Sequence, residues 1–136
     1  MISAKIIRSA KVKEFVCDPS YSSKMLLDDS VAGTHAINVN QGILRGGGRT
    51  AGATHEQNEI YYVLAGEAVL RLDEESHDIQ AGDLVFIPAG VFHGLENKSQ
   101  TQEFILLTFW ERAADNEVWH ARVKAWGKSF KTIDED

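Results

Sequence analysis

Three side chains near the middle of the sequence have the chemistry of metal ligands. His55 and Glu59 lie four residues apart, directly before the apolar run Ile60–Leu64, and His93 follows a Pro-x-Gly turn where a further strand is predicted to open. Imidazole nitrogens and carboxylate oxygens bind borderline divalent ions such as Fe, Mn, Ni or Zn. If the two segments pack as adjacent hairpins, the three groups converge. Two histidines and one carboxylate with open positions suit non-haem Fe(II) chemistry.

Short strands must position these residues. Runs of β-branched, aromatic and aliphatic residues alternate with turn signals such as Gly46-Gly47-Gly48 and Pro88-Ala89-Gly90, which predicts an all-β sandwich or barrel. The predicted strands are His35–Leu44, Ile60–Leu64, Ala68–Leu72, Leu84–Ile87 and Phe104–Trp110, with one more opening at His93. Two of these runs are apolar at consecutive positions, so we expect both of their faces to be covered, by the barrel interior and by another sheet or subunit.

The C-terminal part changes to a helical period. Val118, Trp119, Val123 and Trp126 recur at the spacing of one helix face. This pattern predicts a short amphipathic α-helix over about residues 116–126 that packs against the barrel.

Two stretches of the chain carry motifs with fixed spacing. The first reads Gly47, five residues, Ala53-Thr54-His55, three residues, Glu59, six residues and Gly66. The second reads Gly82, five residues, Pro88-Ala89-Gly90, two residues, His93, three residues and Asn97. Together they resemble the paired motifs of the cupin superfamily. The departure is Ala53, which stands where the family has its first histidine.

The resemblance implies a double-stranded β-helix, or jelly roll, which is frequently dimeric and binds a divalent metal near one mouth of the barrel. We therefore predict a single cupin domain over residues 1–136, with a barrel core over about 34–110. The ligands would be His55, Glu59 and His93, because the methyl group of Ala53 cannot bind metal. Loss of one ligand either opens a position for water or substrate, or marks a pocket that no longer binds metal.

Tyr61 and Gln57 are candidates for contacts with a bound ligand. Tyr61 shares a strand face with Glu59, so its hydroxyl could orient substrate or a metal-bound water, or it could simply pack in the core. Gln57 carries an amide oxygen close to the ligands and could replace the missing histidine.

Two more candidates depend on which face of the first long strand is inward. If the aliphatic residues Ile37, Val39 and Ile43 face the interior, then His35, Gln41 and Arg45 do as well. Arg45 would then favour a carboxylate or phosphate on the substrate, with Gln41 helping to position it. The alternatives are a surface arginine beside the glycine turn and an exposed histidine at the strand end.

Composition narrows the function further. A net charge of −6 argues against non-specific nucleic-acid binding, and no apolar stretch approaches the roughly 20 residues of a membrane span. The single cysteine, Cys17, rules out an internal disulfide and favours a cytoplasmic setting. We expect a homodimer with a small-molecule ligand in the barrel and neither nucleic acid nor membrane as partner.

The first functional hypothesis is a divalent-metal-dependent enzyme acting on a small organic acid or sugar derivative, of oxygenase, isomerase, lyase or decarboxylase type. The alternatives are a non-catalytic domain that binds or senses a small ligand through a degenerate metal site, and a structural or storage role.

Overall fold

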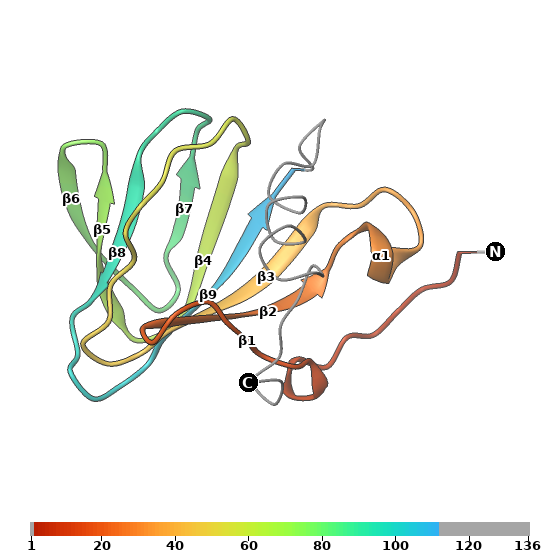
Figure 1. The fold of residues 1–136 in the computed structure, drawn as a ribbon. Coiled ribbons are helices and arrows are strands. Elements are labelled where there is room, and N and C mark those ends of the chain that lie inside the picture. The colour runs from red at the N-terminus through yellow and green to blue at the C-terminus, as the bar shows by residue number, and fades with distance from the viewer. Residues whose placement is uncertain (1, 112–136) are drawn as a thin grey trace.

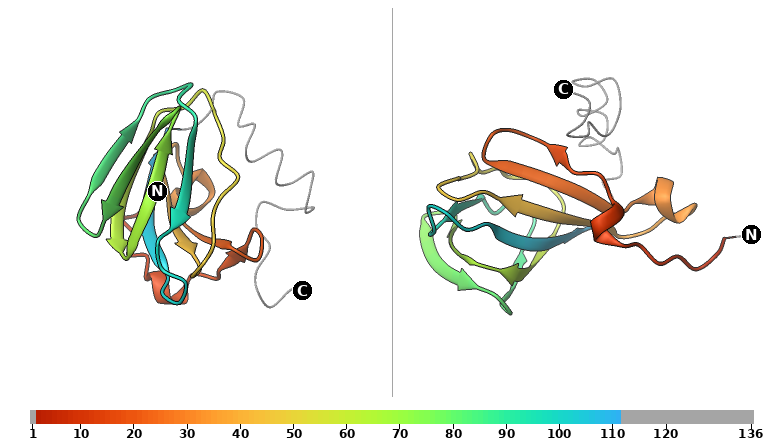
Figure 2. Two further views of the ribbon diagram at one scale, coloured as in Figure 1. Left: turned by 90° about the vertical axis from the view of Figure 1, so that its left-hand side faces the viewer. Right: turned by 90° about the horizontal axis from the view of Figure 1, so that it is seen from below.

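Two antiparallel sheets form the protein in the computed structural model, which describes residues 2–111 (Figure 1). The larger sheet has the order β1 (Phe15–Val16), β2 (Tyr21–Leu27), β3 (Asn38–Leu44), β9 (Phe104–Trp110), β4 (Glu59–Ala65) and β7 (Leu84–Ile87). The smaller sheet has the order β6 (Glu75–Gln80), β5 (Glu67–Leu72) and β8 (His93–Asn97). The strands curve around a shared interior, as Figure 2 shows, which confirms the predicted all-β jelly-roll barrel.

Apolar side chains from both sheets fill the interior of the barrel. Side chains alternate along each strand, so every second residue of β4 and β9 points inward. The resulting core contains Leu44, Tyr61, Val63, Ala68, Leu70, Ile79, Ile87, Leu95, Phe104 and Leu106. Because this core occupies one end of the barrel, the polar residues Glu59 and Thr108, further along the same inward faces, lie at the other end.

The chain before and after the barrel contributes little regular structure within the described residues. A 3-10 turn, η1 (Ser9–Lys11), precedes β1, and a single helical turn, α1 (Asp29–Ala32), connects β2 to β3. Neither is long and apolar enough to cross a membrane. The helix predicted over 116–126 lies outside the described residues.

Three strands were not predicted from the sequence, and one was predicted too long. β1 and β6 are edge strands that are short or rich in polar residues, and β2 lies inside its sheet but begins with a polar stretch, so none of the three was predicted. The strand predicted from His35 begins at Asn38 instead. His35 is exposed, with its Nδ1 atom 3.7 Å from Oδ2 of Asp29, so it does not face the barrel interior.

Asn97, the last residue of β8 and of the second motif, ties three segments together. Its buried Nδ2 amide donates to the carbonyl oxygens of Leu44, Arg45 and Gln102 at 2.8–3.1 Å. Its Oδ1 accepts from the backbone amide of Ser99 at 2.9 Å. These bonds join β8 to the end of β3 and to the loop before β9, and so hold the smaller sheet against the larger one.

We predict that Asn97→Ala lowers the free energy of unfolding by about 2–4 kcal/mol, because it removes four hydrogen bonds made by a side chain that is itself buried. Chemical denaturation monitored by circular dichroism measures this change. Gln100→Ala, an exposed neighbour, is the control and should be close to neutral. A loss of less than about 1 kcal/mol for Asn97→Ala would show that the side chain does not hold the sheets together.

The outer face of β4 and β7 carries large apolar side chains that the described residues leave exposed. They are Tyr62, Leu64, Leu84 and Phe86, with exposed fractions of 40%, 44%, 63% and 56%. β7 is the last strand of its sheet, so this face continues to a free edge. The homodimer expected from the sequence stays a prediction, and this apolar face is where a second copy would pack.

The oligomeric prediction can be tested by sedimentation or light scattering. We expect the wild-type protein to have twice the monomer mass, and the double variant Leu84→Glu/Phe86→Glu to have the monomer mass while keeping its β-sheet spectrum. Ile37→Glu introduces the same charge at an exposed apolar residue elsewhere and should leave the dimer intact. A monomeric wild-type protein would contradict the prediction.

Candidate metal centre

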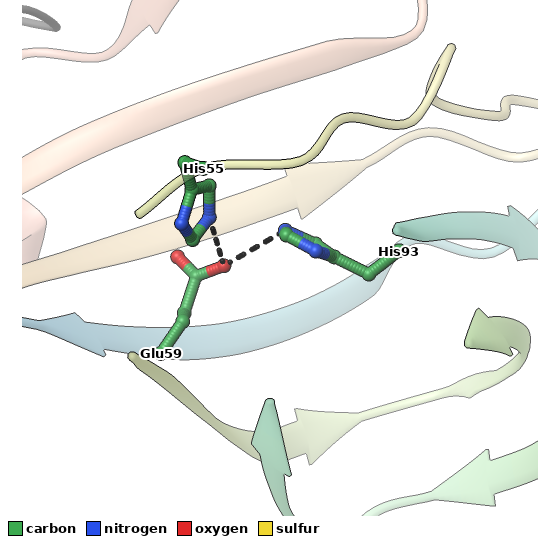
Figure 3. A group of neighbouring side chains, drawn as sticks. All are labelled: His55, Glu59 and His93. Atoms are coloured by element: carbon green, nitrogen blue, oxygen red, sulfur yellow. Dashed lines mark ion pairs between the residues drawn. The ribbon is translucent and has the colours of Figure 1, made fainter. Parts of the chain in front are cut away.

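His55, Glu59 and His93 meet inside the barrel, as the sequence predicts (Figure 3). Glu59 opens β4, His93 opens β8, and His55 lies in the loop that leads into β4. The Oε1 atom of Glu59 is 3.5 Å from Nε2 of His55 and 3.2 Å from Nε2 of His93. Ligands about 2.1 Å from one ion stand roughly 3–4 Å apart, so both distances suit a shared ion.

The backbone fixes how each imidazole presents its nitrogens. Nδ1 of His55 lies 2.9 Å from the carbonyl oxygen of Gln57, and Nδ1 of His93 lies 2.9 Å from that of Val91. A carbonyl oxygen only accepts hydrogen bonds, so each Nδ1 carries a proton. The Nε2 atoms of the neutral rings are therefore left with their lone pairs directed at the shared point. Metal-binding histidines are typically oriented in this way.

Backbone hydrogen bonds hold the two motifs side by side. The amide of Gly90, in the turn before β8, donates to the carbonyl of His55 at 2.8 Å. Ala53 and His93 exchange both of their backbone bonds at 3.0 Å, as in a narrow antiparallel pair. Gly52 has a φ of +84° and packs so closely on Phe92 that a Cβ atom would lie 2.3 Å from its ring. The loop before His55 can approach β8 only because this residue is glycine.

Ala53 occupies a position from which a side chain would reach the centre. It lies directly opposite His93, where cross-strand Cβ atoms are roughly 5 Å apart. It also lies two residues before His55, on the same face of an extended segment. A histidine in place of Ala53 would therefore extend from the same side of this backbone pair as His93.

Electrostatics inside the barrel favour a positive charge at this point. Burial raises the pKa of Glu59, but hydrogen bonds and charge interactions with the two histidines outweigh burial, and the net shift is downward. A hydrogen bond that protonated His55 donates to the carboxylate of Glu59 raises the pKa of His55, against the opposing effect of burial. If both histidines were neutral, their Nε2 lone pairs would repel the carboxylate oxygen of Glu59. Either a proton on His55 or a divalent ion between the three groups removes this repulsion. The donor set therefore fits a divalent metal.

A cavity of about 170 Å³ adjoins two of the three ligands, His55 and Glu59, on the side of the larger sheet. Its walls are formed by Tyr21, Ser23, Asn40, His55, Gln57, Glu59, Tyr61, Thr108 and Trp110. The structure thus brings two other predicted residues to the site, Tyr61 and Gln57. Burial, with smaller effects from Glu59 and Tyr21, raises the pKa of Tyr61 well above its usual range, so its phenol stays protonated.

Gln41 and Arg45 do not reach the site, so the prediction that they face the barrel interior is wrong. Gln41 accepts a hydrogen bond from the hydroxyl of Ser9 at 2.6 Å, on the outer side of β3. Nη2 of Arg45 donates to Ser22 at 2.6 Å and to Glu14 at 3.4 Å, also outside the cavity. The prediction took the wrong face of β3 as the inner one, because Asn40 and Leu44 point inward and Val39 and Ile43 do not.

The sequence prediction missed Tyr21, Ser23, Asn40, Thr108 and Trp110, all of which line the cavity. Tyr21 and Ser23 belong to β2, a strand that was not predicted. Thr108 could have been found, because it continues the inward alternation of Phe104 and Leu106 along β9.

Comparison with known proteins identifies the family. The cupin domain family matches residues 42–110, which is half of the chain. An uncharacterized protein of Methanocaldococcus jannaschii is 29% identical over 100 residues, which cover 71% of this chain and 80% of that protein. This chain belongs to the cupin family.

Solved structures agree with this fold. A predicted oxalate decarboxylase of Thermotoga maritima superposes with a TM-score of 0.70 at 24% identity, over 79% of this chain and 98% of that one. The polyketide cyclase RemF of Streptomyces resistomycificus superposes with a TM-score of 0.71 at 23% identity, over 79% of each chain. At these identities the likeness shows the shared fold alone.

Metal binding should be pH-dependent, because an ion must displace the proton from His55. The pKa of His55 is raised above its ordinary value of 6.5. We therefore predict that protons begin to compete with the metal ion for His55 at a higher pH than they would for a free imidazole. Below the pKa of His55 the apparent affinity for Zn²⁺ should fall about tenfold per pH unit. Calorimetric titrations with Zn²⁺ at several pH values between roughly 6 and 8, the range in which histidines titrate, measure this slope.

The metal-free protein provides the control for that slope. NMR titration should give His55 a higher pKa in the wild-type protein than in Glu59→Gln, which lacks the carboxylate charge. An affinity for Zn²⁺ that does not change with pH would contradict the assignment of His55 as a ligand.

Proposed function

We propose that this cupin is a divalent-metal-dependent enzyme that acts on a small organic molecule bound in the barrel. The observation that carries the proposal is the orientation of the two imidazoles. Their Nδ1 atoms are bound to the carbonyls of Gln57 and Val91, so both Nε2 atoms face Glu59. Metal-binding histidines typically donate one ring N–H to a carbonyl in this way and direct the other nitrogen at the ion.

His55, Glu59 and His93 would hold the ion. When bound, a divalent ion would supply Lewis acidity toward a carbonyl or carboxylate oxygen, because three protein ligands leave open positions on the ion. Tyr61 lies on the inward face of β4 with Glu59 and stays protonated, so its hydroxyl is available to donate to the carboxylate or to a bound molecule. The barrel walls exclude bulk water from the buried side of the site, where His93 is only 7% exposed.

Metal analysis of protein purified without added metal tests the proposal. We expect close to one equivalent of a divalent ion, a lower melting temperature after chelation, and recovery when the ion is restored. His93→Ala should weaken metal binding by at least about a hundredfold, whereas the exposed His77→Ala should not change it. Absence of metal, with no stabilisation on addition of Zn²⁺, Mn²⁺, Ni²⁺ or Fe²⁺, would refute the proposal.

A gain-of-ligand variant tests the geometry from the other direction. Ala53→His should tighten Zn²⁺ binding by about tenfold or more, because the new imidazole would lie beside His93 and on the same side as His55. Thr54→His places the same side chain on the opposite face and serves as the control. Equal affinities for the two variants would show that position 53 does not face the centre.

A second candidate function is a non-catalytic cupin that binds or senses a small ligand, and Ala53 is the observation that favours it. With one ligand fewer than the family motif, the ion could serve only to order the pocket. Turnover of any compound that binds, abolished by chelation, would favour the enzyme. Binding without turnover would favour the sensor.

Our proposal of a cytoplasmic location rests on the single cysteine.

A further inference from the structure

The outer face of the smaller sheet carries a second cavity, which none of the three metal ligands lines. On β5 and β8 every second residue is buried in the core, so Arg71, Gly94 and Glu96 lie on the face turned away from the metal centre. The loop before β4 runs along the edge of β8 (Figure 1), and it adds Arg49 opposite Glu96. The cavity has a volume of about 330 Å³, and its walls include Arg49, Thr50, Arg71, Ser76, Phe92 and Glu96.

A glycine in the middle of this face leaves room for the cavity. Gly94 pairs with Arg71 in the register of β5 and β8, and it has no side chain to fill the space above the sheet. The side chain of Arg71 crosses this space, and its guanidinium carbon lies 4.5 Å from the centre of the Phe92 ring. Stacking on an aromatic ring holds the guanidinium in one orientation and leaves the N–H groups at its edge free to donate.

The two arginines of the cavity lack carboxylate partners. Within residues 2–111, neither Arg49 nor Arg71 forms an ion pair, although the protein as a whole has a net charge of −6. Among the residues that line the cavity, Glu96 is the one carboxylate, so the positive charges exceed the negative by one. Asp78, on the same face of β6, lies 3.4 Å from Lys98 instead. An anion placed between the two guanidinium groups would relieve their mutual repulsion.

Two hydroxyl groups add uncharged donors to the same walls. Oγ1 of Thr50 accepts a hydrogen bond from the backbone amide of Leu95 at 3.0 Å, so its own proton is left to donate to a ligand. Ser76 pairs with Arg71 across β5 and β6, and its side chain is exposed. Arg49 stands two strand spacings from Arg71, or roughly 10 Å, so both long side chains can reach one group placed between them.

We propose that this cavity binds a small organic anion, whose phosphate or carboxylate group is held between Arg49 and Arg71 and whose body lies against the ring of Phe92. Guanidinium groups pair with both kinds of anion through two parallel hydrogen bonds. A cavity of about 330 Å³ falls in the size range of small-molecule sites and has room for more than the anionic group. The site lies on the opposite face of β8 from His93, and the proposal does not depend on metal binding.

Three probes that share a phenyl ring test the inference: phenyl phosphate, benzoate and the neutral benzamide. Two-dimensional ¹H–¹⁵N NMR of the full-length protein follows the backbone amides of Arg71 and Gly94 as each probe is added, with zinc and after chelation. We expect at least one of the anions to bind about fivefold or more tighter than benzamide in both states, and more weakly as salt is added. The tighter of the two anions identifies the site as one for phosphate or for carboxylate.

Substitution of the arginines assigns the binding to this cavity. Arg71→Gln and Arg49→Gln should each weaken binding of the preferred anion about threefold to tenfold, because each removes one guanidinium. Arg71→Lys keeps the charge but loses the planar fork, so it should restore only part of the affinity. Arg8→Gln is the matched control, because Arg8 is exposed but does not line the cavity, and it should keep the wild-type affinity.

Several outcomes overturn the inference. They are benzamide binding as tightly as either anion, no binding of either anion, shifts at the metal cavity without shifts at Arg71 or Gly94, and equal losses of affinity in Arg8→Gln and Arg71→Gln. The comparison of probes uses the wild-type protein, so it stands even if a variant does not fold. If the protein binds no metal, the proposed function fails, but the measurements on the metal-free protein still decide the anion site.

Discussion

Two hydrogen bonds from imidazole to backbone carbonyl set the chemistry of this barrel. Because Nδ1 of His55 and of His93 are both committed to carbonyl oxygens, the opposite nitrogens of the two rings are directed at one carboxylate. The carbonyls belong to loops whose shape depends on close backbone contacts, including the one that only Gly52 permits. The orientation of the ligands is therefore a property of the backbone, and it does not require a bound ion to exist.

The same barrel separates apolar from polar chemistry along its length. On β9 the inward residues change from Phe104 and Leu106, in the core, to Thr108, in the cavity. The core end supplies the burial that stabilises the barrel, and Asn97 joins the two sheets there. The residues that line the cavity lie mostly on strands that continue into this core. The core therefore holds the walls of the cavity in place.

The three ligands could be predicted from the sequence because two motifs with fixed spacing place Glu59 and His93 at the starts of strands and His55 in the loop before one. The face of β3 could not be predicted. Its outward residues Val39 and Ile43 are more apolar than the inward Asn40, because the N-terminal segment covers that side and Ser9 contacts Gln41. Alternation alone gives the two faces but not which one is inside, and so Arg45 was assigned to the wrong side. β6 was missed because only Ile79 of its residues is buried.

X-ray absorption spectroscopy of the zinc-loaded protein tests the central claim most directly, since the signal of each imidazole ring around the ion can be counted. Our account predicts two imidazoles together with oxygen ligands at about 2.0–2.1 Å. A spectrum with one imidazole or none would show that His55 and His93 do not share an ion, and would contradict the account.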